Sequence, residues 1–436
     1  MYVRFVLRLL VLPLFLFGCG GGGGDSGGNS QAPQPKTEAG GVLDTTFGSQ
    51  GIAVVGSNPT PGQVLTIAEY ADGSLLAGGS PHWIAKFAPD GQLDPAFASA
   101  GRDTTSRATH DVQLVVALRI LADQRAIVLE IDFNPCIGPV CRQVPADQLL
   151  ARRIDARGQP DPTYGENGLR PTAPGHAAIS PSGRIVAGVD QAMTGVDTEG
   201  RIDATFQANA AAATQCAPHL QVRSAGLVFD AEKLIVAQLN NSSGASSLCV
   251  RRLNADGSSD LAFGSNGRQE FALPLSRSEY RVLRVLVRGD GETIVFVVPE
   301  VGSSPPLGSI VVYLTPDGRL DATLNGSGMQ LQPTLLPSVT RDVAIQENAK
   351  IVATGQSARL EGGSFVIDPD NPMVTRSSPT LSLFDAGFGP VRGGYVLTKT
   401  GTVILTPFSL WVARDGSIVV GGSLEGPGTP AMLRVR

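Results

Sequence analysis

The stretch that decides the fold is Leu253-Asn254-Ala255-Asp256-Gly257-Ser258-Ser259-Asp260-Leu261-Ala262-Phe263-Gly264, because degenerate copies of it recur along the chain. The shared phrase is an Asp, two variable residues, a large apolar residue and, in most copies, Gly. Its copies are centred on Asp44, Asp94, Asp161, Asp203, Asp260 and Asp321, with a worn copy at Asp385. Their spacing, roughly fifty to sixty residues, lies near the upper end of the range for propeller repeats. The phrase therefore predicts a repeat architecture.

Each repeat also contains two β-runs joined by a turn, as at Asp72-Gly73, Asp290-Gly291 and Asp415-Gly416. Asp and Gly accept the positive φ of a tight turn, so each pair of runs predicts a hairpin. A third run follows, such as Cys249-Val-Arg-Arg-Leu253, and a fourth, such as Gln269-Glu-Phe-Ala-Leu273. The Lys and Arg residues of the third runs suggest that one face of this strand is wetter than the other. Four antiparallel strands in each of seven units predict an all-β protein, a seven-bladed β-propeller.

Both ends of the repeat region predict how the ring closes. The region opens midway through a unit, with Leu43-Asp44 and the run Ile52 to Val55, and it stops after the third run Met432 to Val435. The N-terminal strand can then complete the last blade and remove an exposed sheet edge. The unit containing Gly362 to Ser378 departs most from the pattern.

These phrases resemble the delta-60 repeat family of bacterial secreted or cell-surface proteins. The best match is the stretch Leu253 to Gly264, followed by Phe87 to Asp94 and Leu314 to Asp321, and the resemblance covers about residue 42 to the end. It implies a β-propeller, and it implies no common catalytic activity or cofactor. The repeated Asp, Gly and Phe residues are expected to serve turns and packing between blades, the alternative being a repeated ligand or metal site.

The N-terminus is typical of an exported lipoprotein. Arg4 and Arg8 precede a short apolar core, so residues 1–18 predict a signal peptide that is too short to anchor the chain as a spanning helix. Leu16-Phe17-Gly18-Cys19 resembles the bacterial lipobox, which implies lipidation of Cys19 and anchoring to the membrane; the alternative is an ordinary signal peptide with an incidental Cys. We expect residues 19–41 to form a Gly-rich, disordered tether and residues 42–436 to form the propeller. Gly20 in place of Asp favours the outer membrane of the bacterial cell envelope.

Composition narrows the possible partners. The 436 residues include 53 Gly and 31 Pro but only 17% charged residues, which favours short strands and many turns over long helices. The net charge of −5 argues against nucleic acid as a partner, because phosphate binding needs a basic surface. We expect a monomer with no cofactor, no metal and no catalytic residue that the sequence identifies.

Four cysteines remain besides Cys19, and an exported chain makes disulfides plausible. Of three possible pairings we favour Cys136 with Cys141 and Cys216 with Cys249; a metal site is the alternative. His82, His110, His176 and His219 fall in different units, where surface or loop positions are expected unless the ring gathers them at its channel.

Two further features are candidates for binding. Asp368-Pro-Asp370-Asn371 could hold calcium in a loop, although a plain solvated turn fits the residues better. His82-Trp83 and the segment Asp132 to Asp147 are predicted to form an exposed binding rim, with Trp83 alternatively in the core.

Three functions are compatible with these features. The first is a non-catalytic binding or scaffold module for a protein or glycan, because irregular insertions between regular strands let loops carry recognition. The second is a propeller enzyme, a hydrolase or lyase acting on carbohydrate or lactone at the central channel. The third is a purely structural component of the envelope.

Overall fold

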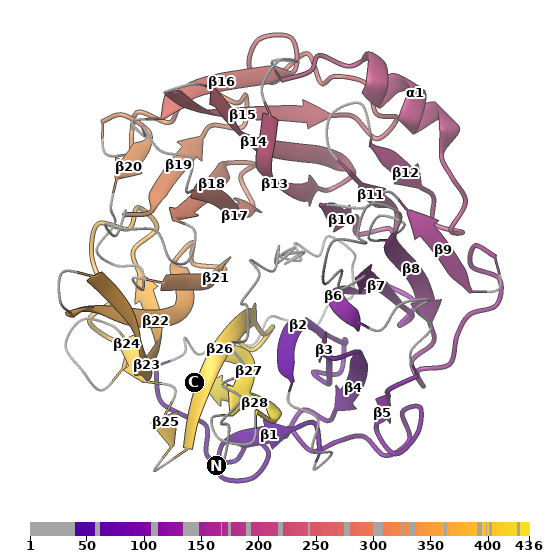
Figure 1. The fold of residues 1–436 in the computed structure, drawn as a ribbon, viewed down its shortest axis with the longest axis vertical. Helices are drawn as coiled ribbons and strands as arrows, with labels where there is room; N and C mark the ends of the chain where they lie inside the picture. The colour runs from indigo at the N-terminus through magenta and orange to yellow at the C-terminus, as the bar shows by residue number, and fades with distance from the viewer. Residues whose placement is uncertain are drawn as a thin grey trace, which may run out of the picture.

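The computed structural model describes residues 40–56, 62–105, 112–133, 148–166, 168–172, 176–188, 193–216, 221–242, 245–273, 280–299, 308–324, 326–331, 337, 339–361, 364–389, 395–397, 399–400, 403–424 and 428–436. They form seven antiparallel sheets arranged in a ring (Figure 1). This arrangement is a seven-bladed β-propeller, and the predicted fold class is confirmed.

Blades I to IV follow one another along the chain, and each starts with its innermost strand. Blade I contains β2 (Gln63–Glu69), β3 (Leu75–Ser80), β4 (Trp83–Phe87) and β5 (Arg102–Asp103). Blade II contains β6 (Val112–Ile120), β7 (Ala126–Phe133), β8 (Gln148–Ile154) and β9 (Leu169–Thr172). Blade III contains β10 (Ala177–Ile179), β11 (Ile185–Ala187), β12 (Thr194–Val196) and the helix α1 (Ala204–Ala212). Blade IV contains β13 (Gln221–Asp230), β14 (Lys233–Ser242), β15 (Ala245–Leu253) and β16 (Arg268–Leu273).

Blades V to VII complete the ring. Blade V contains β17 (Tyr280–Val287), β18 (Thr293–Pro299), β19 (Ile310–Leu314) and β20 (Met329–Leu331). Blade VI contains β21 (Val339–Ile345), β22 (Ile351–Glu361), β23 (Ser364–Ser377) and β24 (Tyr395–Leu397). Blade VII contains β26 (Val403–Val412), β27 (Ile418–Leu424), β28 (Pro430–Val435) and β1 (Ile52–Val54), with the short β25 (Lys399–Thr400) paired to β26.

The two ends of the chain close the ring, as the sequence predicts. Strand β1 pairs antiparallel with β28, with Ile52 opposite Leu433 and Val54 opposite Ala431. A further bridge joins Leu43 to Val435. The first and last strands of the propeller thus share one sheet, and the outer edge of β28 is paired.

The buried apolar side chains lie between neighbouring blades rather than in one central core. Seven apolar clusters hold the buried side chains, and each spans mainly the interface of two neighbouring blades. Strand β19, for example, is buried at all five positions, because its sheet is covered on both faces. This explains why the strands read as continuous Val and Ile runs rather than as alternating patterns.

Blade III departs from the expected fourth strand. Asp203 caps α1, since its Oδ1 accepts the N–H of Phe206 at 2.9 Å. In most other copies Gly follows the aromatic residue and turns the chain back with positive φ, as Gly264 does at 55°. Gln207 stands at this position in blade III, and the Ala-rich run after it continues as helix. Within the described part of the chain no helix is long and apolar enough to cross a membrane.

Candidate functional site

The two ends of the ring are built differently. Because the strands of a blade alternate in direction, the turns from first to second strand and from third to fourth strand lie at one end. We call it the constant end. The connections from second to third strand, and from one blade to the next, lie at the other end, which we call the variable end.

Turn length is nearly uniform at the constant end. The connections from first to second strand comprise residues 70–74, 121–125, 180–184, 231–232, 288–292, 346–350 and 413–417, five residues in all but one blade. Their hydrogen bonds repeat as well. In blade I, for example, the N–H of Tyr70 donates to the carbonyl of Ser74 at 2.8 Å, and Oδ1 of Asp72 accepts the N–H of Ser74 at 2.9 Å.

Connection length varies widely at the variable end. The connections from second to third strand comprise residues 81–82, 134–147, 188–193, 243–244, 300–309, 362–363 and 425–429, from two to fourteen residues. The sequence repeat determines where the strands lie, but it does not determine the lengths of these connections. A regular scaffold with loops of unequal length at one end is the usual arrangement for recognition.

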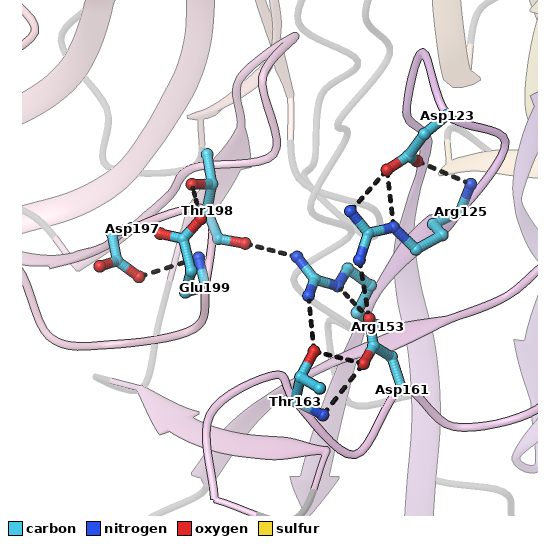
Figure 2. Close-up of polar contacts among 8 residues, drawn as sticks. All are labelled: Asp123, Arg125, Arg153, Asp161, Thr163, Asp197, Thr198 and Glu199. Atoms are coloured by element: carbon cyan, nitrogen blue, oxygen red, sulfur yellow. Dashed lines mark hydrogen bonds and ion pairs between the residues drawn. The ribbon is translucent and has the colours of Figure 1, made fainter.

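The repeated Asp holds the constant end together through a buried Arg. Asp161 accepts the N–H and hydroxyl of Thr163 on Oδ1, at 3.0 and 2.6 Å, and Nε of Arg153 on Oδ2, at 2.8 Å (Figure 2). Arg125 adds a second guanidinium at 2.8 Å. We call this pairing of a phrase Asp with an Arg from the third strand the Asp–Arg lock. It recurs, with Asp first, as Asp260–Arg252, Asp385–Arg376 and Asp44–Arg434.

The lock reaches into the next blade. Nη1 of Arg153 donates to the carbonyl of Thr198 in blade III at 2.7 Å, as Figure 2 shows, and the guanidinium lies 5.1 Å from the ring centroid of Tyr164. Arg252 repeats both contacts, with the carbonyl of Pro316 in blade V and the ring of Phe263. The phrase therefore joins neighbouring blades through charge, aromatic stacking and backbone hydrogen bonding together.

Close packing explains the Gly of the Asp-Gly turns that precede the phrase. A Cβ added to Gly318, whose φ is +82°, would lie 2.8 Å from the ring of Phe263 in the preceding blade. The aromatic side chain of one copy occupies the space that a side chain in the next would need. The short distance to the ring and the positive φ therefore both require Gly at this residue.

Electrostatics favour the ionised carboxylate in the lock. Desolvation alone would raise the pKa of Asp161, but hydrogen bonds from Thr163, Arg125 and Arg153 outweigh it and hold the pKa well below its usual range. The pKa of Asp260 is lowered in the same way, with desolvation opposed by hydrogen bonds from Lys233 and Arg252.

Three blades carry altered versions of the lock. Lys86 replaces the Arg in blade I and lies 3.3 Å from Asp94. Blade III pairs Asp203 with Arg184, which comes from a turn, at 3.2 Å. In blade V the third strand has Tyr313 at this position, and the Asp321 side chain accepts hydrogen bonds from the N–H and the hydroxyl of Thr323. The six Asp residues singled out by the sequence therefore lie in six different blades and do not converge on one site.

A second set of side chains ties the inner strands to one another. His176, Ser224, Asp342 and Ser409 each reach the backbone of the next blade's inner strand. Ser409 closes the ring by donating to the carbonyl of Val64 at 3.1 Å. His176 accepts the N–H of Ala225 on Nε2 at 3.2 Å, and desolvation lowers its pKa to about 4.

Charged residues meet between blades I and II near the variable end. Oε1 of Glu130 accepts a hydrogen bond from Nε of Arg152 at 2.6 Å and lies 3.1 Å from Nε2 of His82. The guanidinium of Arg152 also pairs with Asp103 at 3.1 Å. Desolvation would raise the pKa of Glu130, but the charge of Arg152 and the hydrogen bond with His82 outweigh it and lower the pKa. The side chains of His82 and Glu130 are 4% and 0% exposed, so the cluster joins two blades and is closed to a large substrate.

Two expectations about exposure are wrong. His82 and Trp83 form no exposed rim: His82 is buried against Glu130 of blade II, and the alternative position of Trp83, in the core between blades VII and I, is confirmed. The Arg residues of the third strands do not mark a wetter face, since Arg153, Arg252 and Arg376 are buried in the locks. Their regular position, eight or nine residues before the phrase Asp, is the sequence signal that could have identified them.

The cysteine and calcium predictions have different outcomes. Cys216 and Cys249 form a disulfide that joins the segment after α1 to β15 of blade IV. Cys19, Cys136, Cys141, His110 and His219 lie outside the described residues. The backbone of Asp368 to Asn371 belongs to β23 rather than to a loop, and it bulges out of register opposite β22. Among the described residues no group of three or more His, Cys, Asp or Glu could hold a metal ion.

The fold and its repeated locks define a β-propeller, and comparisons with known proteins are consistent with this class. Residues 233–263 match the family described as "Domain of unknown function (DUF5122) beta-propeller". No curated protein matches the chain.

Several solved structures are similar to this chain at a low level. One is the α-L-arabinofuranosidase Arb93A from Fusarium graminearum, with 12% identity, 90% of this chain and 98% of that chain covered, and a TM-score of 0.43. Another is the polysaccharide lyase Uly1, with 10% identity, 93% and 95% covered and a TM-score of 0.39. The WD40 domain of SCAP from fission yeast has 11% identity, 88% and 97% covered and a TM-score of 0.41. Enzymes and WD40 domains both occur among these, so the comparisons do not determine the function.

Proposed function

We infer that this chain is a lipid-anchored β-propeller of the bacterial cell envelope, and that it binds a protein or glycan without catalysis through the variable end. The observation that carries this proposal is the difference between the ends. Locks and near-uniform turns fix the constant end, whereas connections of two to fourteen residues follow the strands at the variable end. Recognition needs surface that differs from blade to blade, and in this chain the variable end supplies it.

The path of the N-terminal segment supports the orientation of such a module. The carbonyl of Gly40 accepts the N–H of Gly389 from the phrase of blade VI at 2.9 Å, and Val42 pairs with Arg436 at the end of β28. Residues 40–42 therefore lie at the constant end. A lipid on Cys19 would hold this end towards the membrane and leave the variable end facing away from it.

Crosslinking on intact cells tests the proposal. A tagged full chain is compared with Cys19→Ala, which removes the anchor, and with a variant in which residues 134–147 are replaced by a short Gly-Ser linker. Arg319→Gln is the matched control, because Arg319 is 80% exposed at the constant end. We expect a specific partner that is lost from the first two variants and kept in the control. Absence of any specific partner, or one retained by both variants, would contradict the proposal.

A further inference from the structure

One position of the inner strands is apolar in four blades and Arg in two. Six inner strands contain an irregularity in register, at which one residue has no partner on the second strand. Leu65, Val116, Leu283 and Phe408 occupy this position in blades I, II, V and VII. Arg341 occupies it in blade VI, and the backbone of Arg223 in blade IV. Two of the six positions thus carry Arg, and of these two the structure describes the side chain of Arg341.

The surroundings of Arg341 are apolar. Its guanidinium lies 5.6 Å from the ring centroid of Phe408 on the neighbouring inner strand. Phe408 in turn packs against the cluster that contains Leu65 and Val116, which are only 7% and 5% exposed. An Arg at this place stacks on an aromatic ring and gives up part of its hydration.

Arg341 has no counter-charge among the residues that the structure describes. Its Nε is buried without a hydrogen-bond partner. The adjacent Asp342 is already occupied, since it binds Arg284 and accepts the N–H groups of Val343 and Leu410. Desolvation lowers the pKa of Arg341, whereas a neighbouring carboxylate would act in the opposite direction.

Buried Arg side chains elsewhere in the ring have the partner that Arg341 lacks among the described residues. Arg153, Arg252 and Arg152 each bind an Asp or Glu within 2.8 Å. Removing a guanidinium from water without a partner is unfavourable, and a planar donor fork of this kind matches a carboxylate in bidentate geometry. Arg341 is the third residue of β21, which begins at the variable end. Arg341 therefore lies in the half of β21 that is nearer the variable end.

We propose that Arg341, stacked on Phe408, binds a carboxylate group of the ligand that the variable end recognises. This inference rests on the proposed binding function and adds the ligand chemistry to it. The carboxylate can belong to a sugar acid or to an acidic peptide side chain, and the two sources are separated by the probes below.

The experiment measures ligand-induced stabilisation of the folded chain at constant ionic strength. The probes come in matched pairs, D-galacturonate with D-galactose, and a Glu-containing peptide with its Gln counterpart. They are tested on the wild-type chain, on Arg341→Met and on Arg319→Gln. We expect saturable stabilisation by at least one carboxylate probe but not by its neutral partner. Arg341→Met should weaken its binding about tenfold or more, and Arg319→Gln should leave it unchanged.

Stability without ligand separates binding from a structural role. Met keeps the apolar contact with Phe408 and removes the unpaired charge, so Arg341→Met should melt at the same temperature as the wild type or higher. A lower melting temperature together with equal probe binding in both proteins would overturn the inference. So would a wild-type chain that binds no carboxylate probe. Partner capture from cells tests the binding function independently, so a partner retained by Arg341→Met alongside absent carboxylate binding would leave that function standing and refute the role of Arg341.

Discussion

The constant and variable ends of this propeller are made from the same strands but follow different rules. At the constant end, four blades repeat the same Asp–Arg lock and six blades use turns of equal length. At the variable end the connections from second to third strand range from two to fourteen residues, and the His82–Glu130–Arg152 cluster near this end has no counterpart described in the other blades. The difference suggests that stability and recognition are separated along the ring axis.

The largest effect on stability is expected from the disulfide. It attaches the segment after α1, where a helix replaces the paired fourth strand of the other blades. It spans 33 residues of sequence, and chain entropy assigns a crosslink of that length about 3–4 kcal/mol. We expect Cys249→Ala to lower the free energy of unfolding by about this amount in urea denaturation. Reductant should destabilise the wild type by more than it destabilises the variant, because only the wild type contains the Cys216–Cys249 bond. A wild type insensitive to reductant would contradict the prediction.

The contribution of the lock to stability can be measured by removing the phrase Asp from a blade that has the lock and from one that lacks it. Asp260→Ala removes the partner of buried Arg252 and should cost about 3 kcal/mol of folding free energy. Asp321→Ala removes an Asx turn with Thr323 and should cost about 1 kcal/mol. Urea denaturation of the two variants checks the order. Equal losses would show that the guanidinium partner contributes little.

The inner ring responds to pH through His176. Its pKa is about 4 in the folded chain, below the ordinary value near 6.5, so the unfolded chain binds more protons between these values. Stability should therefore fall by about 2–3 kcal/mol as the pH drops from 6.5 to 4. In His176→Gln, whose amide oxygen can still accept the N–H of Ala225, this part of the pH dependence should disappear. An identical slope in both proteins would assign the effect to other groups.

The smallest effect on stability is expected at the variable end. Replacing residues 134–147 with a short Gly-Ser linker should change the free energy of unfolding by less than about 1 kcal/mol, because loop-closure entropy depends weakly on length. Thermal unfolding is the measurement. A loss as large as that of Asp260→Ala would show that this connection stabilises the ring, and the separation of roles would not hold there.

Sequence patterns predicted the architecture because the same local chemistry recurs in every unit. Asp, Gly and β-branched runs specify turns and hairpins through their own backbone preferences, and seven copies of one unit leave few alternatives to a closed ring. Ring closure by Ile52–Val54 followed from counting strands. The Cys216–Cys249 pair followed from placing both residues in one region of the chain.

Other features were decided by tertiary structure. Asp203 and Asp260 belong to the same phrase, yet one caps a helix and the other binds Arg252, since the outcome depends on the residue after the aromatic position and on the neighbouring blade.

Whether an Arg is paired or unpaired is likewise invisible in the sequence. Arg153 finds Asp161 and the carbonyl of Thr198, whereas Arg341 meets Phe408. The sequence by itself determined the strands, the turns and the ring, because these depend on local backbone preferences. Only the tertiary structure decided which charges are buried, which are paired and which end varies, because those properties arise where two blades meet.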